Sequence, residues 1–320
     1  MNMWKAAVVL TITGCAARSG APLTPALQET GADAVYYIYV GAESADLLHR
    51  IRFGPTGMDL DQTTPVGEMA VETEGPHGLN VSPDGNHLYM TTAHGVPDGK
   101  LWKFHAGPDT LVAPPILLGN FPATLDLTPD GLYAFIVNFN LHGEHVPSTV
   151  SVVYTPDLVE VDQIPTCTMP HGLRMAKDGL FVYSNCMMDD QLVEIDTRTF
   201  EVSRRFSVTT GSETALLDYQ VGEIVTGANG ITRPLESFSD RKAMESTCSP
   251  TWAQPTPDGR SIFVACNKSN EILVVDRASW TLERRISVPG GPYNLAISED
   301  GKILIASLKS AGKVQFFEAS

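Results

Sequence analysis

The sequence is poor in charged residues, and it has no apolar stretch long enough to cross a bilayer. Only 18% of its 320 residues are charged, and 37 Asp and Glu outnumber 22 Lys and Arg, which gives a net charge of −15. Such an acidic chain is not expected to bind nucleic acid or to dock directly on anionic lipid. The apolar run at residues 6–12 is far shorter than the roughly 20 residues of a membrane-spanning helix.

Several motifs of common enzymes are missing as well. The chain has no Gly-Xaa-Ser-Xaa-Gly elbow, no phosphate-binding loop, no dinucleotide fingerprint and no Cys-Xaa-Xaa-Cys-His haem motif. Helical periodicity is scarce, which favours an all-β fold. The sequence therefore assigns no catalytic residue by motif.

The N-terminal segment has the pattern of a bacterial lipoprotein signal. One positive charge at Lys5 precedes the apolar run, and Ile12-Thr13-Gly14-Cys15 resembles the lipobox, in which small residues precede a cysteine that becomes lipidated. We therefore predict a signal peptide over residues 1–15, with Cys15 as the first mature residue and the carrier of the lipid. The alternative is an ordinary signal peptide cut near Ala16.

The next segment is rich in Ala, Pro, Gly, Ser and Thr. We interpret residues 16–33 as a flexible tether and residues 34–320 as one folded domain. Either kind of signal takes the chain out of the cytoplasm. We expect a monomeric lipoprotein, anchored in a membrane and facing the bacterial periplasm or the cell surface.

The folded domain contains an internal repeat marked by Asp-Gly turns. Five copies occur, and their aspartates are separated by 46, 48, 80 and 42 residues: Asp84, Asp130, Asp178, Asp258 and Asp300. A proline lies eight residues before each of these aspartates, and an apolar run follows each turn. These aspartates are turn residues, not catalytic acids. The interval of 80 is close to two repeats, so we predict a decayed copy near residues 210–230.

A period of 40–50 residues with four short strands per unit is typical of a β-propeller. Five clear units, one decayed unit and one N-terminal unit over residues 36–53 give seven. We predict a single seven-bladed β-propeller of four-stranded antiparallel blades over residues 34–320. The last unit stops after residues 314–317, so the termini are expected to share a blade and close the ring.

A family resemblance supports this prediction. The pattern Pro-Xaa-Gly-Leu-Xaa-Xaa-Ser-Pro-Asp-Gly, followed by a Val-Xaa-Xaa-Ile/Val-Asp strand, resembles the YVTN-type seven-bladed propellers, and residues 260–289 match it closely. The resemblance extends over residues 34–320. It implies the fold but not the function, because such propellers host unrelated activities. Some related propellers are lactonases or lyases, and the Pro-His-Gly segments resemble those of streptogramin lyases.

Four cysteines lie in the folded domain: Cys167, Cys186, Cys248 and Cys266. In two repeats, one cysteine precedes the innermost strand and the other ends the next strand. Because these strands are antiparallel, we expect the pairs Cys167/Cys186 and Cys248/Cys266 to form disulfides within their blades in an oxidising compartment. The alternatives are metal-binding thiolates and unpaired thiols.

The same geometry gathers polar residues at one face of the ring, around the central channel; we call this place the mouth. It collects the residues that follow the repeated prolines and those at the ends of the second strands. The predicted ligand or partner site comprises His77, His94, Asn138, His142, His145, His171, Met187, Thr251 and Tyr293.

Three functions remain open from the sequence. The first is a binding module for a small ligand or a protein partner at the mouth. The second is a copper- or zinc-binding propeller, redox-active or not, since imidazole, thiolate and thioether suit these metals; its predicted ligands are His77, His171, Cys186 and Met187. The third is a lactonase- or lyase-like enzyme with a mouth histidine as base. We find no glutamate at an equivalent mouth position to assist that base.

Overall fold

The part of the chain described by the structure forms six small antiparallel sheets around a ring and one separate two-stranded sheet. The computed structural model describes residues 34–69, 71–95, 98–143, 146–217, 224–226, 232–234 and 246–319. The predicted signal peptide with Cys15, the tether and His145 lie outside these residues. No helix in the described ranges is long and apolar enough to span a bilayer.

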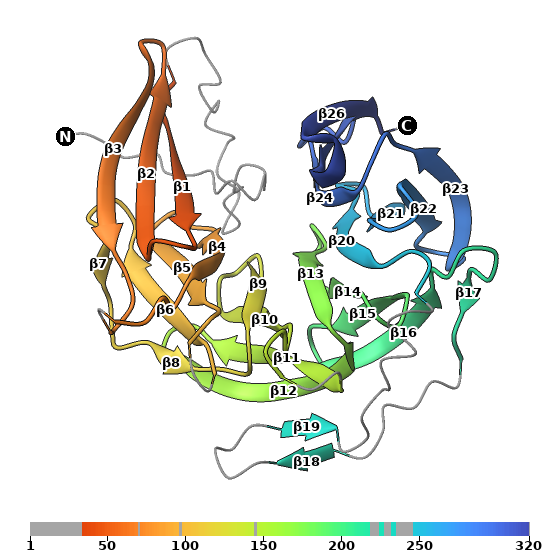
Figure 1. Ribbon diagram of the computed structural model, residues 1–320, viewed down its shortest axis with the longest axis horizontal. Coiled ribbons are helices and arrows are strands. Elements are labelled where there is room, and N and C mark those ends of the chain that lie inside the picture. Colours follow the sequence, from red (N-terminus) through yellow and green to blue (C-terminus); the bar gives the residue numbers. More distant parts are fainter. Residues whose placement is uncertain are drawn as a thin grey trace.

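The sheets follow one another along the chain and around a common axis (Figure 1). Sheet 1 contains β1 (Tyr36–Ala42), β2 (Leu47–Gly54) and β3 (Gly57–Pro65). Sheet 2 contains β4 (Pro76–Val81), β5 (His87–Thr92), β6 (Lys100–His105), β7 (Thr110–Leu111) and β8 (Ile116–Leu117). Sheet 3 contains β9 (Pro122–Leu127), β10 (Tyr133–Asn138), β11 (Pro147–Tyr154) and β12 (Val159–Thr168).

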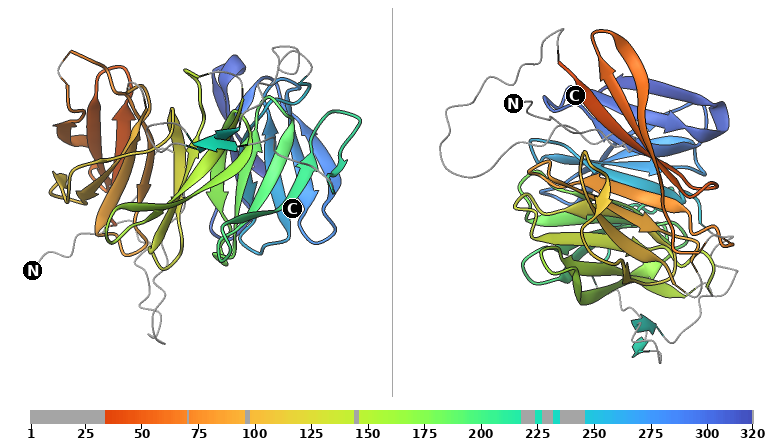
Figure 2. Two further views of the ribbon diagram at one scale, coloured as in Figure 1. Left: turned by 90° about the horizontal axis from the view of Figure 1, so that it is seen from below. Right: turned by 90° about the vertical axis from the view of Figure 1, so that its left-hand side faces the viewer.

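Sheet 4 contains β13 (Pro170–Met175), β14 (Phe181–Cys186), β15 (Gln191–Asp196), β16 (Glu201–Ser207) and β17 (Thr214–Ala215); sheet 5 contains β20 (Pro250–Pro255), β21 (Ser261–Cys266), β22 (Glu271–Asp276) and β23 (Thr281–Ser287). Sheet 6 contains β24 (Pro292–Ile297), β25 (Ile303–Leu308) and β26 (Lys313–Glu318), with the short 3₁₀ helix η1 (Lys309–Ala311) between its last two strands. A separate pair, β18 (Ile224–Thr226) and β19 (Thr232–Pro234), lies outside the ring (Figure 1). Figure 2 shows the sheets standing next to one another.

The repeated turns build the hairpins as predicted. The glycine of each Asp-Gly turn has a φ of 71–73°, a conformation that glycine adopts without steric cost. The aspartate accepts a hydrogen bond from the backbone two residues later, as Asp178 does from Leu180 N at 3.0 Å. Apolar side chains on facing sheets pack between neighbouring units, so the core is divided into layers that each join two sheets.

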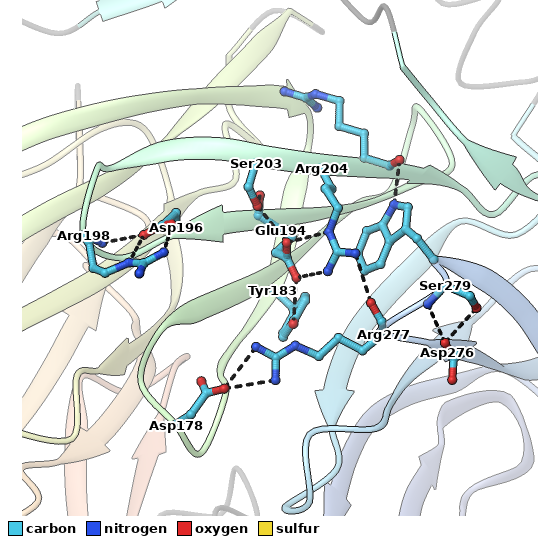
Figure 3. A network of polar contacts seen from close by, with 12 residues as sticks. Asp178, Tyr183, Glu194, Asp196, Arg198, Ser203, Arg204, Asp276, Arg277 and Ser279 are labelled. Carbon is cyan, nitrogen blue, oxygen red and sulfur yellow. Dashed lines mark hydrogen bonds and ion pairs between the residues drawn. The ribbon is translucent and has the colours of Figure 1, made fainter.

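The all-β propeller arrangement is confirmed, but the ring has six blades and not seven. No decayed blade separates sheets 4 and 5. Arg277 of sheet 5 forms an ion pair with Asp178 of sheet 4 at 3.0 Å, and Arg204 Nη1 donates to the Arg277 carbonyl at 3.0 Å (Figure 3). The interval of 80 residues therefore holds an insertion. Only sheets 3 and 5 have four strands; sheets 2 and 4 have five, and sheets 1 and 6 have three.

The predicted closure by shared termini is wrong for the described residues. Sheets 1 and 6 are separate, and they flank an opening in the ring (Figure 1). The turn after β1 corresponds to the turn after β14, because Asp46 and Asp190 occupy its fourth position with the same φ of 48°. Thus β1 matches the second strand of the other sheets. Sheet 1 lacks an inner strand in the described part of the chain, and sheet 6 lacks an outer one.

Candidate functional site

Hydrogen bonds between neighbouring inner strands join the residues that follow the repeated prolines. His77 Nδ1 donates to the Ala123 carbonyl at 2.7 Å, since a carbonyl oxygen can only accept. His171 Nδ1 likewise donates to the Thr251 carbonyl at 3.0 Å, and the Thr251 hydroxyl donates to the Tyr293 carbonyl at 2.7 Å. The position directly after each repeated proline therefore holds residues that connect one sheet to the next.

His171 is fully occupied by these contacts. Its side chain is buried, and its Nε2 accepts a hydrogen bond from the Tyr293 hydroxyl at 2.9 Å because Nδ1 already carries the proton. The rings of Phe139 and Trp252 meet it edge-on. Burial lowers the pKa of His171 to about 4, so this imidazole is neutral at pH 7. It has no free lone pair with which to bind a metal or accept a proton from a substrate.

The other half of the mouth carries a partly exposed chain of three polar side chains, which we call the Glu43–His94–His142 cluster. Glu43 Oε1 accepts a hydrogen bond from His94 Nε2 at 2.8 Å. His94 Nδ1 then lies 2.9 Å from His142 Nε2. The Glu43 and His94 side chains are 45% and 31% exposed, and His142 is exposed. In contrast to His171, these groups remain accessible to a ligand.

The tautomers of the cluster follow from its hydrogen bonds. A carboxylate can only accept, so His94 carries its hydrogen on Nε2. The Nδ1 atom of neutral His94 is then an acceptor, and His142 must donate from Nε2. This leaves a lone pair on His142 Nδ1.

Phe121 forms the floor beneath the cluster. It is 3% exposed, and its ring meets the rings of His94 and His142 edge-on at centroid distances of 4.8 and 5.3 Å. His77 contacts the same ring at 5.1 Å, and its Nε2 lies 3.9 Å from Glu43 Oε1. Desolvation lowers the pKa of His77. The site thus combines imidazole and carboxylate groups above one buried aromatic ring.

The far side of the mouth is formed by sheet 6. Lys309 Nζ lies 5.1 Å from the centre of the Tyr293 ring, within the range of a cation–π contact. Burial raises the pKa of Tyr293, and the negative charge of Glu43 adds to the shift. The field of Glu43 on sheet 1 therefore reaches a side chain of sheet 6.

Other predicted mouth residues have structural partners. Asn138 is 1% exposed, and its side-chain nitrogen donates to Thr149 at 2.9 Å and to Ser151 at 2.8 Å. Thr251 is fully buried in its hydrogen bonds between strands. Met187 packs against the small apolar layer around Phe121. These three residues stabilise the mouth, and none of them projects from it as the cluster does.

The predicted cysteine pairings are confirmed, but the Cys167–Cys186 disulfide does not lie within one blade as predicted. Cys167 is in β12 of sheet 3 and Cys186 is in β14 of sheet 4, so this disulfide joins two neighbouring sheets. Cys167 and Cys186 are bonded with Cα atoms 5.8 Å apart, and Cys248 and Cys266 with Cα atoms 4.5 Å apart. Cys186 therefore offers no thiolate to a metal. No group of three His, Cys, Asp or Glu suited to a metal ion occurs among the described residues. The predicted copper or zinc ligand set is not brought together.

Glu43 was missed by the sequence reasoning. Equivalent mouth positions are identified by counting from the Asp-Gly turns, and sheet 1 has no such turn. Glu43 could have been found from the four-residue turn 43–46, because this turn matches the turn 187–190 when β1 is aligned with β14. That alignment places Glu43 at the mouth.

Comparisons with known proteins show the fold alone. No protein-family model matches the chain, and no curated protein matches it. A functionally unknown protein from Desulfotomaculum acetoxidans is similar in structure, with a TM-score of 0.59 and 12% identity over 88% of this chain and 78% of that one. Kuenenia stuttgartiensis hydrazine synthase matches with a TM-score of 0.49 and 16% identity over 87% of this chain and 93% of that chain. The similarity to the Desulfotomaculum protein, at 12% identity, supports the fold alone, and the function of this chain has to be argued from the mouth.

Proposed function

We propose that this protein is an exported, membrane-tethered propeller of the YVTN type that binds a small ligand or a protein partner at its mouth. The observation that carries the proposal is the accessibility of the Glu43–His94–His142 cluster. It is held by the sheet 1 turn and the neighbouring loops above the buried ring of Phe121. Buried polar groups are normally hydrogen-bonded, as His171 is, whereas the three groups of the cluster are exposed or half-buried.

The chemistry of the cluster defines the ligand. Imidazole and carboxylate groups supply hydrogen-bond donors and acceptors, whereas the Phe121 ring beneath them is buried. Ligand sites commonly contain a few converging polar groups. We therefore expect a small molecule, or a protruding side chain of a partner, that carries several hydrogen-bonding groups.

Binding is tested by recording imidazole ¹⁵N spectra while a panel of amino acids, nucleobases and aromatic carboxylates is added. A true ligand shifts the signals of His94 and His142 saturably, and His142→Ala weakens its binding at least about tenfold. The matched control is His105→Ala, because His105 is exposed on β6, away from the cluster, and its ring packs against the ring of His87. Equal binding by both variants would contradict the assignment of the site.

The tether is tested separately. We expect the full-length chain to incorporate labelled palmitate when it is expressed in a bacterium, and to fractionate with membranes. Cys15→Ser should lose the label and move to the soluble extracytoplasmic fraction. Export with normal cleavage but no label in the unchanged chain would favour the ordinary signal peptide cut near Ala16.

A second candidate function is supported by the order of the cluster itself. A carboxylate that orients one histidine, which in turn orients a second, is an arrangement suited to general-base catalysis. The base would be His142 Nδ1, and the substrates to assay are lactones. Turnover that resists chelators and is lost in both His142→Ala and Glu43→Gln would establish an enzyme. Activity that persists in both variants would exclude this site.

A further inference from the structure

Arg174 places a charged group in the interior of the ring. It lies on β13, one of the innermost strands that surround the axis (Figure 1). The residue is only 3% exposed. Burial lowers the pKa of Arg174 to about 10, so the guanidinium is still charged at pH 7. A buried charge is costly unless it is paired and its donors are hydrogen-bonded.

The hydrogen bonds of Arg174 use only part of its guanidinium group. Nη1 donates to the carbonyl of Leu173 at 3.1 Å. The Nε and Nη2 atoms are buried and have no hydrogen-bond partner among the described residues. Nε and Nη2 lie along one edge of the guanidinium, where two parallel N–H groups can hold both oxygens of a carboxylate. The unpaired donors of Arg174 are therefore those that recognise a carboxylate.

The one acidic residue of the innermost strands β4, β9, β13, β20 and β24 is Asp126, and it does not supply that carboxylate. Its oxygens accept hydrogen bonds from Asn80 Nδ2 at 2.7 Å, Leu127 N at 2.9 Å and Met175 N at 2.9 Å. Burial raises the pKa of Asp126, and the charge of Arg174 opposes this shift. Asp126 thus acts on Arg174 through space, while both of its oxygens are bonded to other donors.

A second arginine of the chain shows the same arrangement with a carboxylate in place. Arg204 Nε and Nη2 donate to the two oxygens of Glu194 at 2.8 and 2.6 Å (Figure 3). Arg204 Nη1 donates to a backbone carbonyl, that of Arg277, at 3.0 Å. Arg204 Cζ lies 4.2 Å from the centre of the Trp280 ring. One guanidinium thus contacts a carboxylate, a backbone carbonyl and an indole.

Arg174 makes the equivalent contacts, except the one to a carboxylate. Its Cζ lies 4.5 Å from the centre of the Trp252 ring, on the neighbouring inner strand β20. Stacking on an indole uses the flat face of a guanidinium and leaves its edges for hydrogen bonds. Trp252 Nε1 is also buried without a partner among the described residues, whereas Trp280 Nε1 donates to the Arg205 carbonyl at 2.9 Å. The Arg174–Trp252 pair therefore has three buried N–H donors to offer.

We propose that Arg174 binds a small carboxylate through Nε and Nη2, beside β13 and β20, with Trp252 Nε1 as a further donor. A water molecule satisfies a donor but leaves the charge of the guanidinium unbalanced, whereas a carboxylate does both. This site is distinct from the Glu43–His94–His142 cluster, because β13 runs from Pro170 at the mouth toward the Asp-Gly turn at the opposite face, and Arg174 is near that end.

The experiment follows side-chain N–H signals in ¹H–¹⁵N spectra of the full chain, with its disulfides intact, while sodium acetate is added at constant ionic strength. We expect the signals of Arg174 Nε–H and Trp252 Nε1–H to change saturably. The matched control within the same sample is Arg204 Nε–H, because Glu194 already occupies that edge of Arg204. Its signal should stay unchanged.

A variant tests the geometry of the donors apart from their charge. Arg174→Lys keeps the positive charge but removes the edge with two parallel N–H groups, so acetate binding should weaken at least about tenfold. The control variant is Arg198→Lys, because Arg198 is exposed and already paired with Asp196. It should bind acetate as the unchanged protein does. The comparison of Arg174 with Arg204 needs no variant, so the test is complete even if the Arg174→Lys chain does not fold.

Four outcomes overturn the proposal. If acetate left the Arg174 signal unchanged, water would be sufficient for its donors. Equal changes at Arg174 and Arg204, or the same response to sodium chloride, would show a general effect of ions. Unweakened acetate binding by folded Arg174→Lys would place the anion elsewhere. Saturation by inorganic phosphate but not by acetate would assign the site to a tetrahedral oxyanion instead of a carboxylate.

Discussion

The two halves of the mouth use histidine in opposite ways. His171 is buried, and both of its ring nitrogens are bonded to neighbouring strands. His94 and His142 are hydrogen-bonded to each other at the surface of the same mouth, and His94 is also hydrogen-bonded to the exposed Glu43. The sequence pattern groups these three histidines, yet burial separates them. Burial therefore distinguishes His171, which connects neighbouring strands, from His94 and His142, which are accessible to a ligand.

The largest expected effect is on the buried half. His171→Ala removes a side chain and leaves the Tyr293 hydroxyl and the Thr251 carbonyl without partners, so we expect a loss of about 3 kcal/mol in the free energy of unfolding. His142→Ala should change it by less than about 0.5 kcal/mol. Chemical denaturation of both variants measures the difference. Equal losses would mean that the two histidines have the same structural role.

The pH dependence should show the same contrast. His171 has a pKa of about 4 in the folded protein, whereas histidine in an unfolded chain titrates near 6.5. Between these values the unfolded state binds more protons, so stability falls as the pH is lowered from about 6.5 to about 4. The expected loss is about 3 kcal/mol. Denaturation midpoints across this range should fall less steeply for His171→Gln, whereas an unchanged profile would contradict the shift.

A smaller effect is expected from the partner of His171. Tyr293→Phe removes the only donor to His171 Nε2 and leaves a buried acceptor unpaired, at a cost of about 1–2 kcal/mol. The ring itself stays, so packing with Lys309 is largely kept. The ¹⁵N signal of His171 Nε2 should also move toward that of a free acceptor. If the signal did not move, this hydrogen bond would have no part in fixing the tautomer.

The smallest effect on stability and the clearest effect on chemistry should come from Glu43→Gln. Glu43 is exposed, so we expect a change in stability below about 0.5 kcal/mol. The amide can donate to His94 as well as accept, so the tautomers of His94 and His142 are no longer fixed. Imidazole ¹⁵N spectra should show a mixture of tautomers in the variant and one form in the unchanged protein. A single form in both would refute the proposed order of the cluster.

The sequence was sufficient for the local structure. The Asp-Gly turns fix the hairpins because glycine alone adopts the required φ without cost. The positions of the cysteines relative to the repeated hairpins predict both pairings, although the Cys167–Cys186 disulfide joins sheets 3 and 4. The residues after the prolines were correctly placed together at the inner strands. Each of these features depends on contacts within one hairpin, or on the same position in neighbouring hairpins.

Features that depend on the whole ring were predicted wrongly. The interval of 80 residues has the length of two repeats, and length alone cannot distinguish a blade from an insertion. Arg277 and Asp178 reveal the direct contact only once sheets 4 and 5 are placed. Glu43 was missed because sheet 1 begins one strand later than the other sheets. The burial of His171 and the exposure of His94 also arise from tertiary packing, which the repeat pattern does not contain.

The disulfides have a consequence for the order in which the chain matures. The two disulfides link residues that are 19 and 18 positions apart in the sequence. If the chain is exported with its N-terminus first and Cys15 carries a lipid, as proposed, Cys167 and Cys186 leave the membrane channel before Cys248 does. The first free cysteine pair available to an oxidant is then the native one, and closing so short a loop is fast. The spacing of the cysteines along the chain thus limits mispairing without help from a disulfide isomerase.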